Sequence, residues 1–193
     1  MLPVRPNVVF RGASTIGSRI APSVHDPPRA TRTFLENLTG YFRCKRCQVC
    51  SLNSCKNRKI CSFQSTATNK TFEVEPFITC STKGVIYLIQ CPCGLQYIGR
   101  TKRALSVRLN EHIAKIRAGF DKHSVSRHFD LKHNRDPSNT LFVGIDKYRP
   151  HWRGSNLVRE ISRQEMAWIH MVKTYTPFGL NIDTDINAFI NNS

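Results

Sequence analysis

The sequence predicts a small α+β domain that follows a basic, cysteine-rich N-terminal extension. Apolar and amphipathic segments follow one another from residue 84 onward in the order strand, strand, helix, strand, helix. That order builds a small antiparallel three-stranded sheet flanked by helices. All eight cysteines lie before residue 94, so they cluster instead of scattering through a core. We expect four segments: an irregular extension at 1–40, a Cys-rich segment at 41–83, the folded domain at 84–185 and a tail at 186–193.

The N-terminal part contains few regular elements. Its first 40 residues hold five prolines, and only TFLENLTG (33–40) predicts a short helix, with Gly40 as its C-cap. In the Cys-rich segment, KTFEVEPFITC (70–80) alternates polar and apolar residues as a half-buried strand does. The N-terminus has no sustained apolar run before a cleavage site, so we expect that the protein is not secreted.

The first half of the folded domain is a hairpin followed by a helix. VIYLI (85–89) is apolar throughout and predicts a central strand. LQYIG (95–99) is its antiparallel partner across the turn CPCG. Leucine and isoleucine then recur at helical spacing over 103–117, and Gly119 is a suitable stop for that helix.

The second half adds one strand and one helix. LFVGI (141–145) predicts the third strand. The last helix should run over about 156–174, with Ser155 or Asn156 as its N-cap, and it should end before Pro177.

The net charge of +16 and the pI near 10.0 indicate a polyanionic partner. Nucleic acid is the first candidate and an acidic membrane surface the second. No run approaches the ~20 apolar residues that a membrane span requires, so we do not expect a membrane protein. Eight cysteines without a secretory signal favour metal binding or reduced thiols over a disulfide framework.

Glu165 does not fit the apolar stripe of the last helix, on which it lies between Ile161 and Trp168. A carboxylate directed at a core is costly unless it is paired or binds a metal. The position alone therefore leaves two interpretations open, a structural ion pair with an arginine or a metal ligand.

Arg108 and His112 form a second unusual pair, because they are four residues apart and border the apolar stripe of the first long helix. Tyr87 and Tyr97 lie on the paired strands and by themselves are as compatible with core packing. Together with Glu165 these side chains suit phosphodiester cleavage. The carboxylate would hold a divalent metal, the arginine would neutralise the phosphate, and a phenol or imidazole would serve as general base.

Two groups of metal-ligand residues are present. Cys91-x-Cys93 at the hairpin tip and His128-x₄-His133 have spacings compatible with a Cys₂His₂ zinc site, for which His123 is a reserve ligand. Upstream, a CxxCxxC segment could hold a second, all-thiolate zinc ion, and Cys80 would then be surplus. The candidate ligands of that second cluster are Cys44, Cys47, Cys50, Cys55 and Cys61.

VIY at 85–87, YIG at 97–99, the Arg-x₃-His helix and the late glutamate together resemble the GIY-YIG nuclease superfamily. More narrowly, IYLIQCPCGLQYIGRT and the stretch 159–181 are similar to the endonuclease domain of Penelope-like retroelements. The resemblance implies a GIY-YIG-like α+β fold and a metal-dependent DNA endonuclease that nicks its substrate. It also implies a parent polyprotein with a reverse transcriptase, for which this chain has no room, and a nuclear location.

The resemblance also implies a role for each matched residue. Tyr87 matches the general base or water-orienting tyrosine, and Tyr97 the tyrosine of the second motif. Arg108 matches the arginine that contacts the scissile phosphate, and His112 the histidine one turn later. Glu165 matches the carboxylate that holds one Mg²⁺ (or Mn²⁺) ion.

Further positions follow from the same resemblance and from the basic charge. Cys91, Cys93, His128 and His133 match the zinc-binding set of the Penelope-like group. The residues expected to contact phosphates are Arg100, Lys102, Arg103 and Lys115, with Asn181 as a phosphate-side asparagine. One departure is Val85, which stands where the first motif expects glycine.

Two other functions are compatible with the composition. A zinc-stabilised, non-catalytic nucleic-acid-binding protein, derived from a decayed or domesticated nuclease, would have the same charge and cysteines. A zinc-ribbon-type adaptor for protein partners would not need a surface this basic. The combination of Tyr87, Arg108 and Glu165 favours the nuclease, because an acid near a polyanion is repulsive without a metal.

Overall fold

Three antiparallel strands form the sheet that organises the fold. In this computed structural model, which describes residues 38–44, 46–52, 58–148 and 157–182, β6 (Val85–Gln90) lies between β7 (Gln96–Thr101) and β8 (Leu141–Lys147). Every residue from Val85 to Ile89 is buried, as expected for an apolar central strand. The structure confirms the α+β class, with strands and helices where the periodicity predicts them.

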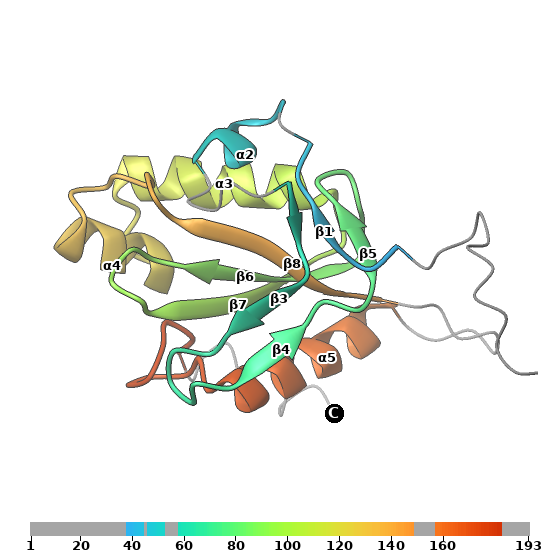
Figure 1. Cartoon of the computed structure of the whole chain (residues 1–193). Coiled ribbons are helices and arrows are strands. Elements are labelled where there is room, and N and C mark those ends of the chain that lie inside the picture. The colour runs from blue at the N-terminus through green and yellow to red at the C-terminus, as the bar shows by residue number, and fades with distance from the viewer. Residues whose placement is uncertain (1–37, 45, 53–57, 149–156, 183–193) are drawn as a thin grey trace, which may run out of the picture. The chain divides into compact units, whose positions relative to one another are not determined.

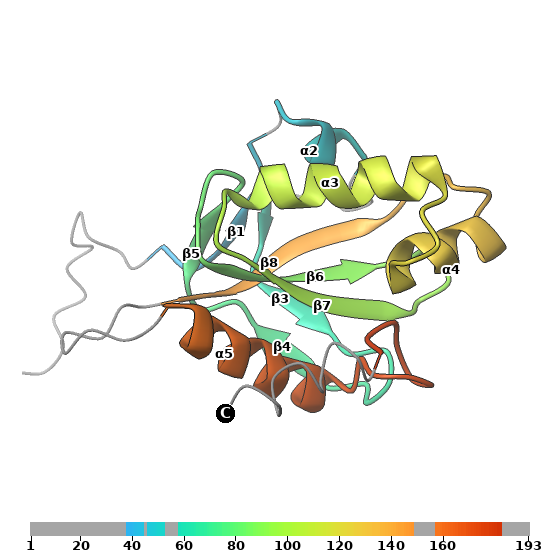
Figure 2. The same ribbon diagram turned by 180° about the vertical axis from the view of Figure 1, so that it is seen from behind.

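Two helices cover the sheet on opposite faces (Figure 1). α3 (Leu105–Ala118) buries Leu105, Leu109, Ile113 and Ile116, and it ends at Gly119 in the left-handed conformation. Burial of each such side chain contributes about 1.5–3 kcal/mol, which holds the helix on the sheet. α5 (Leu157–Val172) covers the other face, an arrangement that Figure 2 shows from behind.

A third helix was not predicted. α4 (Ser124–Lys132) packs against α3 and carries His128, and His133 is its C-cap residue. Its apolar period is weak because only Val125 and Phe129 anchor it, together with the buried Ser126. The sequence pattern alone therefore does not predict this helix.

The Cys-rich segment forms two small sheets of its own. One has the order β2-β1-β5, from β2 (Lys59–Ile60), β1 (Gly40–Phe42) and β5 (Phe77–Thr79). The other pairs β3 (Ser62–Gln64) with β4 (Thr71–Glu73). A short helix, α2 (Gln48–Leu52), follows β1, and buried residues of this segment belong to the same core as the central sheet.

The strand expected at 70–80 and the helix cap expected at Gly40 differ in the structure, and some other predicted positions lie outside the described residues. The single strand expected at 70–80 is two strands, β4 and β5, separated around Pro76, because proline cannot donate a ladder hydrogen bond. Gly40 starts β1 and does not cap a helix, and residues 33–37 of the expected helix lie outside the described residues. The proposed caps Ser155 and Asn156 also lie outside them. Among the described helices, none is long and apolar enough to cross a membrane.

Candidate active site

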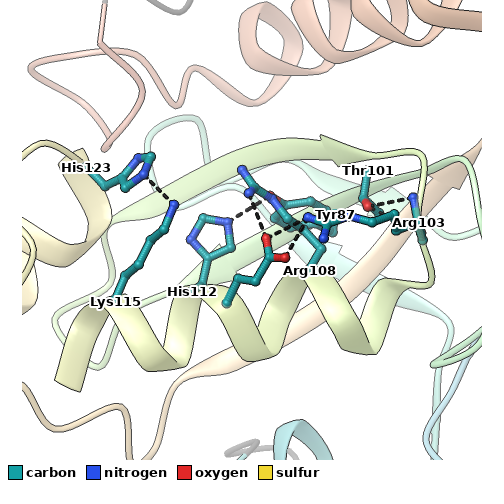
Figure 3. A network of polar contacts seen from close by, with 8 residues as sticks. Tyr87, Thr101, Arg103, Arg108, His112, Lys115 and His123 are labelled. Atoms are coloured by element: carbon teal, nitrogen blue, oxygen red, sulfur yellow. Dashed lines mark hydrogen bonds and ion pairs between the residues drawn. The ribbon is translucent and has the colours of Figure 1, made fainter. Parts of the chain in front are cut away.

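The phenol of Tyr87 is the centre of a buried polar network. Its hydroxyl lies 2.8 Å from His112 Nε2 and accepts a hydrogen bond from Arg108 Nε at 3.0 Å (Figure 3). Tyr87 comes from the middle of the central strand β6, whereas Arg108 and His112 come from successive turns of α3. The structure therefore brings Tyr87 together with two residues that lie 21 and 25 positions further along the sequence.

Tyr87 pairs with a glycine on each neighbouring strand, Gly99 in β7 and Gly144 in β8, and Gly99 makes room for its phenol. A Cβ at Gly99 would lie 2.6 Å from the Tyr87 hydroxyl and 2.7 Å from Cζ, so no side chain fits there. A Cβ at Gly144 would meet Ile78, and also Val85 at 3.3 Å. The glycine of YIG is thus required because the phenol passes directly over it. The ladder between β6 and β8 is also irregular between Ile86 and Tyr87, as is common beside functional residues.

Two backbone hydrogen bonds to the turn Cys80–Thr82, which comes before β6 in the chain, fix the start of α3. Leu105 N–H donates to the carbonyl of Thr82, and Ser106 N–H donates to the carbonyl of Cys80. Arg108 and His112 are four positions apart, so both point from one helix face toward the sheet. The turn Cys80–Thr82 therefore helps to set the position of both polar side chains.

Burial determines the protonation of this network. Burial, with the positive charges of Arg108 and Lys115, lowers the pKa of His112 to about 3. Burial also raises the pKa of Tyr87 to about 12, and although Arg108 opposes this rise, the nearby carboxylates add to it. His112 is therefore neutral and Tyr87 protonated near neutral pH. Arg108 donates to the phenol oxygen, and the tautomer of the neutral imidazole decides whether His112 Nε2 accepts the phenol proton or donates to the same oxygen.

Glu165 lies near this network but is bound to an arginine. Its carboxylate forms an ion pair with Arg100 of β7 at 2.9 Å, and Arg100 also donates to Ser162 on α5. Glu165 is close enough to Tyr87 to contribute to the raised pKa of the phenol. We expected Arg100 at a phosphate, and the structure places it on the candidate metal ligand instead. Of the two interpretations that the position of Glu165 left open, a structural ion pair or a metal ligand, this contact corresponds to the ion pair.

The side chain of Glu165 is a suitable ligand for a hard divalent cation, because Mg²⁺ and Mn²⁺ prefer carboxylate oxygens. The Glu165 side chain is 17% exposed, so it is reachable from solvent. Arg100 is the cation that such an ion would compete with for the carboxylate.

Glu111 and Tyr97 complete the surroundings of the network, and only Tyr97 was predicted. Glu111 forms ion pairs with Arg103 at 2.6 Å and with Arg108 at 3.2 Å. Its spacing of three residues from Arg108 was the available signal, but a glutamate on a helix is usually solvated. Tyr97 packs its ring against His112, with centroids 5.7 Å apart, so it forms a wall of the site.

Residues 83–175 match the family model of the GIY-YIG catalytic domain. No curated protein and no solved structure is similar enough to match this chain. The matched region, here called the GIY-YIG region, contains Tyr87, Arg108, His112 and Glu165. A GIY-YIG domain implies nuclease activity in general, and hence a nucleic acid as substrate.

The basic residues expected at phosphates are placed differently from one another. Lys102 and Arg103 of the GIY-YIG region are exposed, whereas Lys115 is partly buried and contacts His123. Asn181 is buried and holds the backbone of Ile98, whose N–H it accepts at 2.9 Å and to whose carbonyl it donates at 2.8 Å. Asn181 thus fastens β7 from within, which is not the position of a phosphate ligand.

The first zinc-ligand set is brought together at the hairpin tip. The ligand atoms of Cys91, Cys93, His128 and His133 all lie within 4.8 Å of one another. Cys93 Sγ is 3.2 Å from His128 Nε2. Among the described residues, His133 Nε2 is a buried nitrogen without a hydrogen-bond partner, as expected of an atom that awaits a metal.

Cys91 and Cys93 are joined by a disulfide in this structure, although we expected reduced thiols. A disulfide offers no thiolate, so this set can bind zinc only when the pair is reduced. The donor set then has the composition of a Cys₂His₂ site.

The second cluster has a different membership from the predicted one. The fourth member of the cluster is Cys80, whose sulfur lies close to those of Cys44, Cys47 and Cys50. Cys80 was not among the ligands predicted from the sequence. Cys61 is an exposed free thiol away from this cluster, and Cys55 lies outside the described residues.

Proposed function

We propose that this protein is a metal-dependent DNA endonuclease that hydrolyses phosphodiester bonds and nicks its substrate. The observation that carries the proposal is the hydrogen-bonded set of Tyr87, Arg108 and a neutral His112 inside a region that matches the GIY-YIG catalytic domain. A tyrosine that only packs in the core needs one hydrogen-bond partner for its hydroxyl, whereas the Tyr87 hydroxyl contacts both a guanidinium and an imidazole.

Arg108, Tyr87 and His112 would each have a separate role at the scissile phosphate. Arg108 carries a positive charge next to the phenol, so a phosphate that displaces its partner Glu111 would be stabilised there. Tyr87 Oη orients the attacking water, and the tautomer of His112 that carries its proton on Nδ1 would accept the phenol proton at Nε2. An incoming phosphate adds negative charge near His112 and so raises its proton affinity from the low value of the free protein.

Glu165 is the residue that would hold Mg²⁺ or Mn²⁺. When bound, such an ion supplies Lewis-acid stabilisation of the phosphate and the leaving oxygen. Arg100 competes for the Glu165 carboxylate in the free protein, and a bound phosphate would offer this guanidinium a second anionic partner. The exposed Lys102 and Arg103 add to the basic surface that faces the DNA backbone.

Reduced Cys91 and Cys93 would hold a zinc ion with His128 and His133. The unpartnered Nε2 of His133 supports this assignment. Zinc there would supply a structural cross-link between the hairpin tip and α4.

The origin and setting of the protein are a further part of the proposal. The motif IYLIQCPCGLQYIGRT and the stretch 159–181 support descent from a Penelope-like retrotransposon. A retroelement endonuclease would act in the nucleus, with a reverse transcriptase of a larger parent polyprotein as its partner.

A second candidate is a zinc-stabilised nucleic-acid-binding protein without catalysis. The ion pair between Arg100 and Glu165 favours it, since a carboxylate that only stabilises the fold would be paired in this way. Salt-dependent DNA binding is expected of both candidates, so binding alone does not separate them.

The discriminating experiment compares two glutamates of α5. Purified protein is incubated with supercoiled plasmid and Mg²⁺, and nicked circles are counted for wild type, Glu165→Gln and Glu160→Gln. Glu160 is the matched control, because it is also an ion-paired glutamate of this helix, bound to Arg163. We expect Glu165→Gln to reduce nicking by at least about 100-fold while Glu160→Gln keeps it. Equal nicking by both variants would refute the metal role of Glu165, and absence of nicking by wild type would favour the binding protein.

A further inference from the structure

Three cysteines of one short segment and a fourth from further along the chain meet at one end of a parallel strand pair. β1 and β5 run parallel, with Tyr41 opposite Ile78 and Phe42 opposite Thr79. Because parallel strands end at the same edge, Cys44 after β1 and Cys80 after β5 leave the sheet side by side. The chain then turns into α2, where the amide of Cys50 bonds to the carbonyl of Cys47. The turn into α2 and the pairing of β1 with β5 together bring all four sulfurs into one place.

The sulfur separations are those of ligands around one ion. Cys50 Sγ lies 3.5 Å from Cys80 Sγ and 3.8 Å from Cys44 Sγ, and Cys47 Sγ lies 3.8 Å from Cys80 Sγ. A tetrahedron with metal–sulfur bonds of about 2.3 Å has sulfur–sulfur edges of ~3.8 Å. The same sulfurs are too far apart for disulfides, whose bond is about 2.05 Å, and all four are free thiols. They are too close for a four-iron cluster, in which an iron stands between each sulfur and the centre.

We propose that Cys44, Cys47, Cys50 and Cys80 bind a structural zinc ion, in a site separate from the Cys₂His₂ set at the hairpin tip. Four thiolates fill a tetrahedral coordination sphere and leave no open position, so this zinc has no catalytic water. Tyr41, which is fully buried, places its hydroxyl 3.4 Å from Cys80 Sγ. A hydroxyl that orients a ligand sulfur is a typical supporting contact of a metal site.

The zinc site would hold the Cys-rich segment against the helix that carries the polar network. The carbonyl of Cys80 accepts the N–H of Ser106, and that of Thr82 accepts the N–H of Leu105, in the first turn of α3. Cys80 is thus both a ligand and part of the support of α3. Loss of the ion would release Cys44, Cys47 and Cys50 from Cys80 and weaken the support of Arg108 and His112.

The test uses the cysteines of the full chain as reporters, without reference to cleavage. Protein purified with its metal is treated with iodoacetamide before and after a chelator, and each cysteine is quantified by peptide mass spectrometry. Cys44 and Cys61 form a matched pair, since both are exposed thiols but only Cys44 belongs to the cluster. We expect Cys61 to react in both samples and Cys44 to react at least about tenfold more slowly until the chelator is added.

Two outcomes would overturn the proposal. One is alkylation of Cys44 as fast as that of Cys61 before chelation. The other is protection of Cys44 that the chelator does not remove, because a disulfide or another cover would then explain it.

Metal analysis provides the second arm. Cys80→Ser should lose one equivalent of zinc relative to Cys61→Ser, and equal zinc contents would contradict the site. Replacement of zinc by Co²⁺ in a Cys91→Ser chain, which lacks the hairpin-tip set, should still give thiolate-to-cobalt charge-transfer absorption, which reports sulfur ligation by the four-cysteine cluster even if Cys80→Ser does not fold. This readout is independent of nicking, so failure of the nuclease proposal would leave it unaffected.

Discussion

Gly99→Ala tests whether the phenol of Tyr87 is held as tightly as the geometry indicates. The added Cβ would lie 2.6 Å from the hydroxyl, 2.7 Å from Cζ and 2.8 Å from Tyr97 Cε1, so something must shift. Tyr87 is fully buried and its hydroxyl is bound by Arg108 and His112, which makes a small adjustment difficult. Overpacking costs about 1–3 kcal/mol. Weakening the bond from the charged Arg108 adds about 1.5–3 kcal/mol.

We therefore expect Gly99→Ala to lower the free energy of unfolding by about 2.5–6 kcal/mol, measured by urea denaturation. If the protein is a nuclease, displacement of the phenol by about 1 Å should also reduce nicking by about 100-fold. Gly144→Ala is the matched control, because its Cβ would meet Ile78 at 2.6 Å rather than the phenol. It should lose only the overpacking cost of about 1–3 kcal/mol and keep most of its nicking activity when assayed well below its melting temperature.

A double-mutant cycle decides whether the cost arises at Tyr87. In a Tyr87→Leu background the hydroxyl and Cζ are gone, so Gly99→Ala should cost at least about 1 kcal/mol less than in wild type. The same cost in both backgrounds would refute the steric explanation.

Two further predictions concern residues that the structure buries. His112 has a folded-state pKa of about 3, below its ordinary value of 6.5, so the unfolded chain binds a proton that the folded protein does not. Stability should therefore fall by up to about 1.4 kcal/mol per pH unit as pH drops from about 6.5 toward 3, and His112→Asn should flatten this part of a pH series of urea midpoints; an unchanged slope would contradict the neutral, buried imidazole. Asn181→Ala should cost about 2–4 kcal/mol, because it leaves the N–H and carbonyl of Ile98 buried without their partner. Fluorescence anisotropy should show its DNA affinity within twofold of wild type, whereas weaker binding at unchanged stability would restore a phosphate-contacting role.

The central sheet and its two covering helices were predictable because their signals are local. β6 is apolar at every position, and the stripe Leu105, Leu109 and Ile113 of α3 repeats at helical spacing. α4 was not predictable in the same way, because its burial rests on few residues and its position depends on packing against α3. Helices of this length are decided by tertiary contacts more than by their own pattern.

The candidate site shows the same division between local and non-local signals. Arg108 and His112 were visible as an i, i+4 pair, and their contact with Tyr87 follows from α3 lying across β6. Membership of Cys80 in the thiol cluster was not visible, because it depends on the parallel pairing of β1 with β5 and not on spacing within CxxCxxC. The partner of Glu165 could not be chosen from sequence either, since Arg100 reaches it only through the packing of α5 on β7.

The central claim is that the Tyr87 hydroxyl serves phosphodiester hydrolysis, and removal of that single oxygen tests it most directly. Tyr41 supplies the matched control, because it is also fully buried and its hydroxyl also contacts another side chain, Cys80. The measurement is the initial rate of plasmid nicking in Mg²⁺ by Tyr87→Phe and Tyr41→Phe, with both variants first shown to be folded. The account predicts that Tyr87→Phe is slower than wild type by about 10²–10⁴-fold and that Tyr41→Phe retains cleavage. Nicking by Tyr87→Phe at the rate of Tyr41→Phe would contradict it.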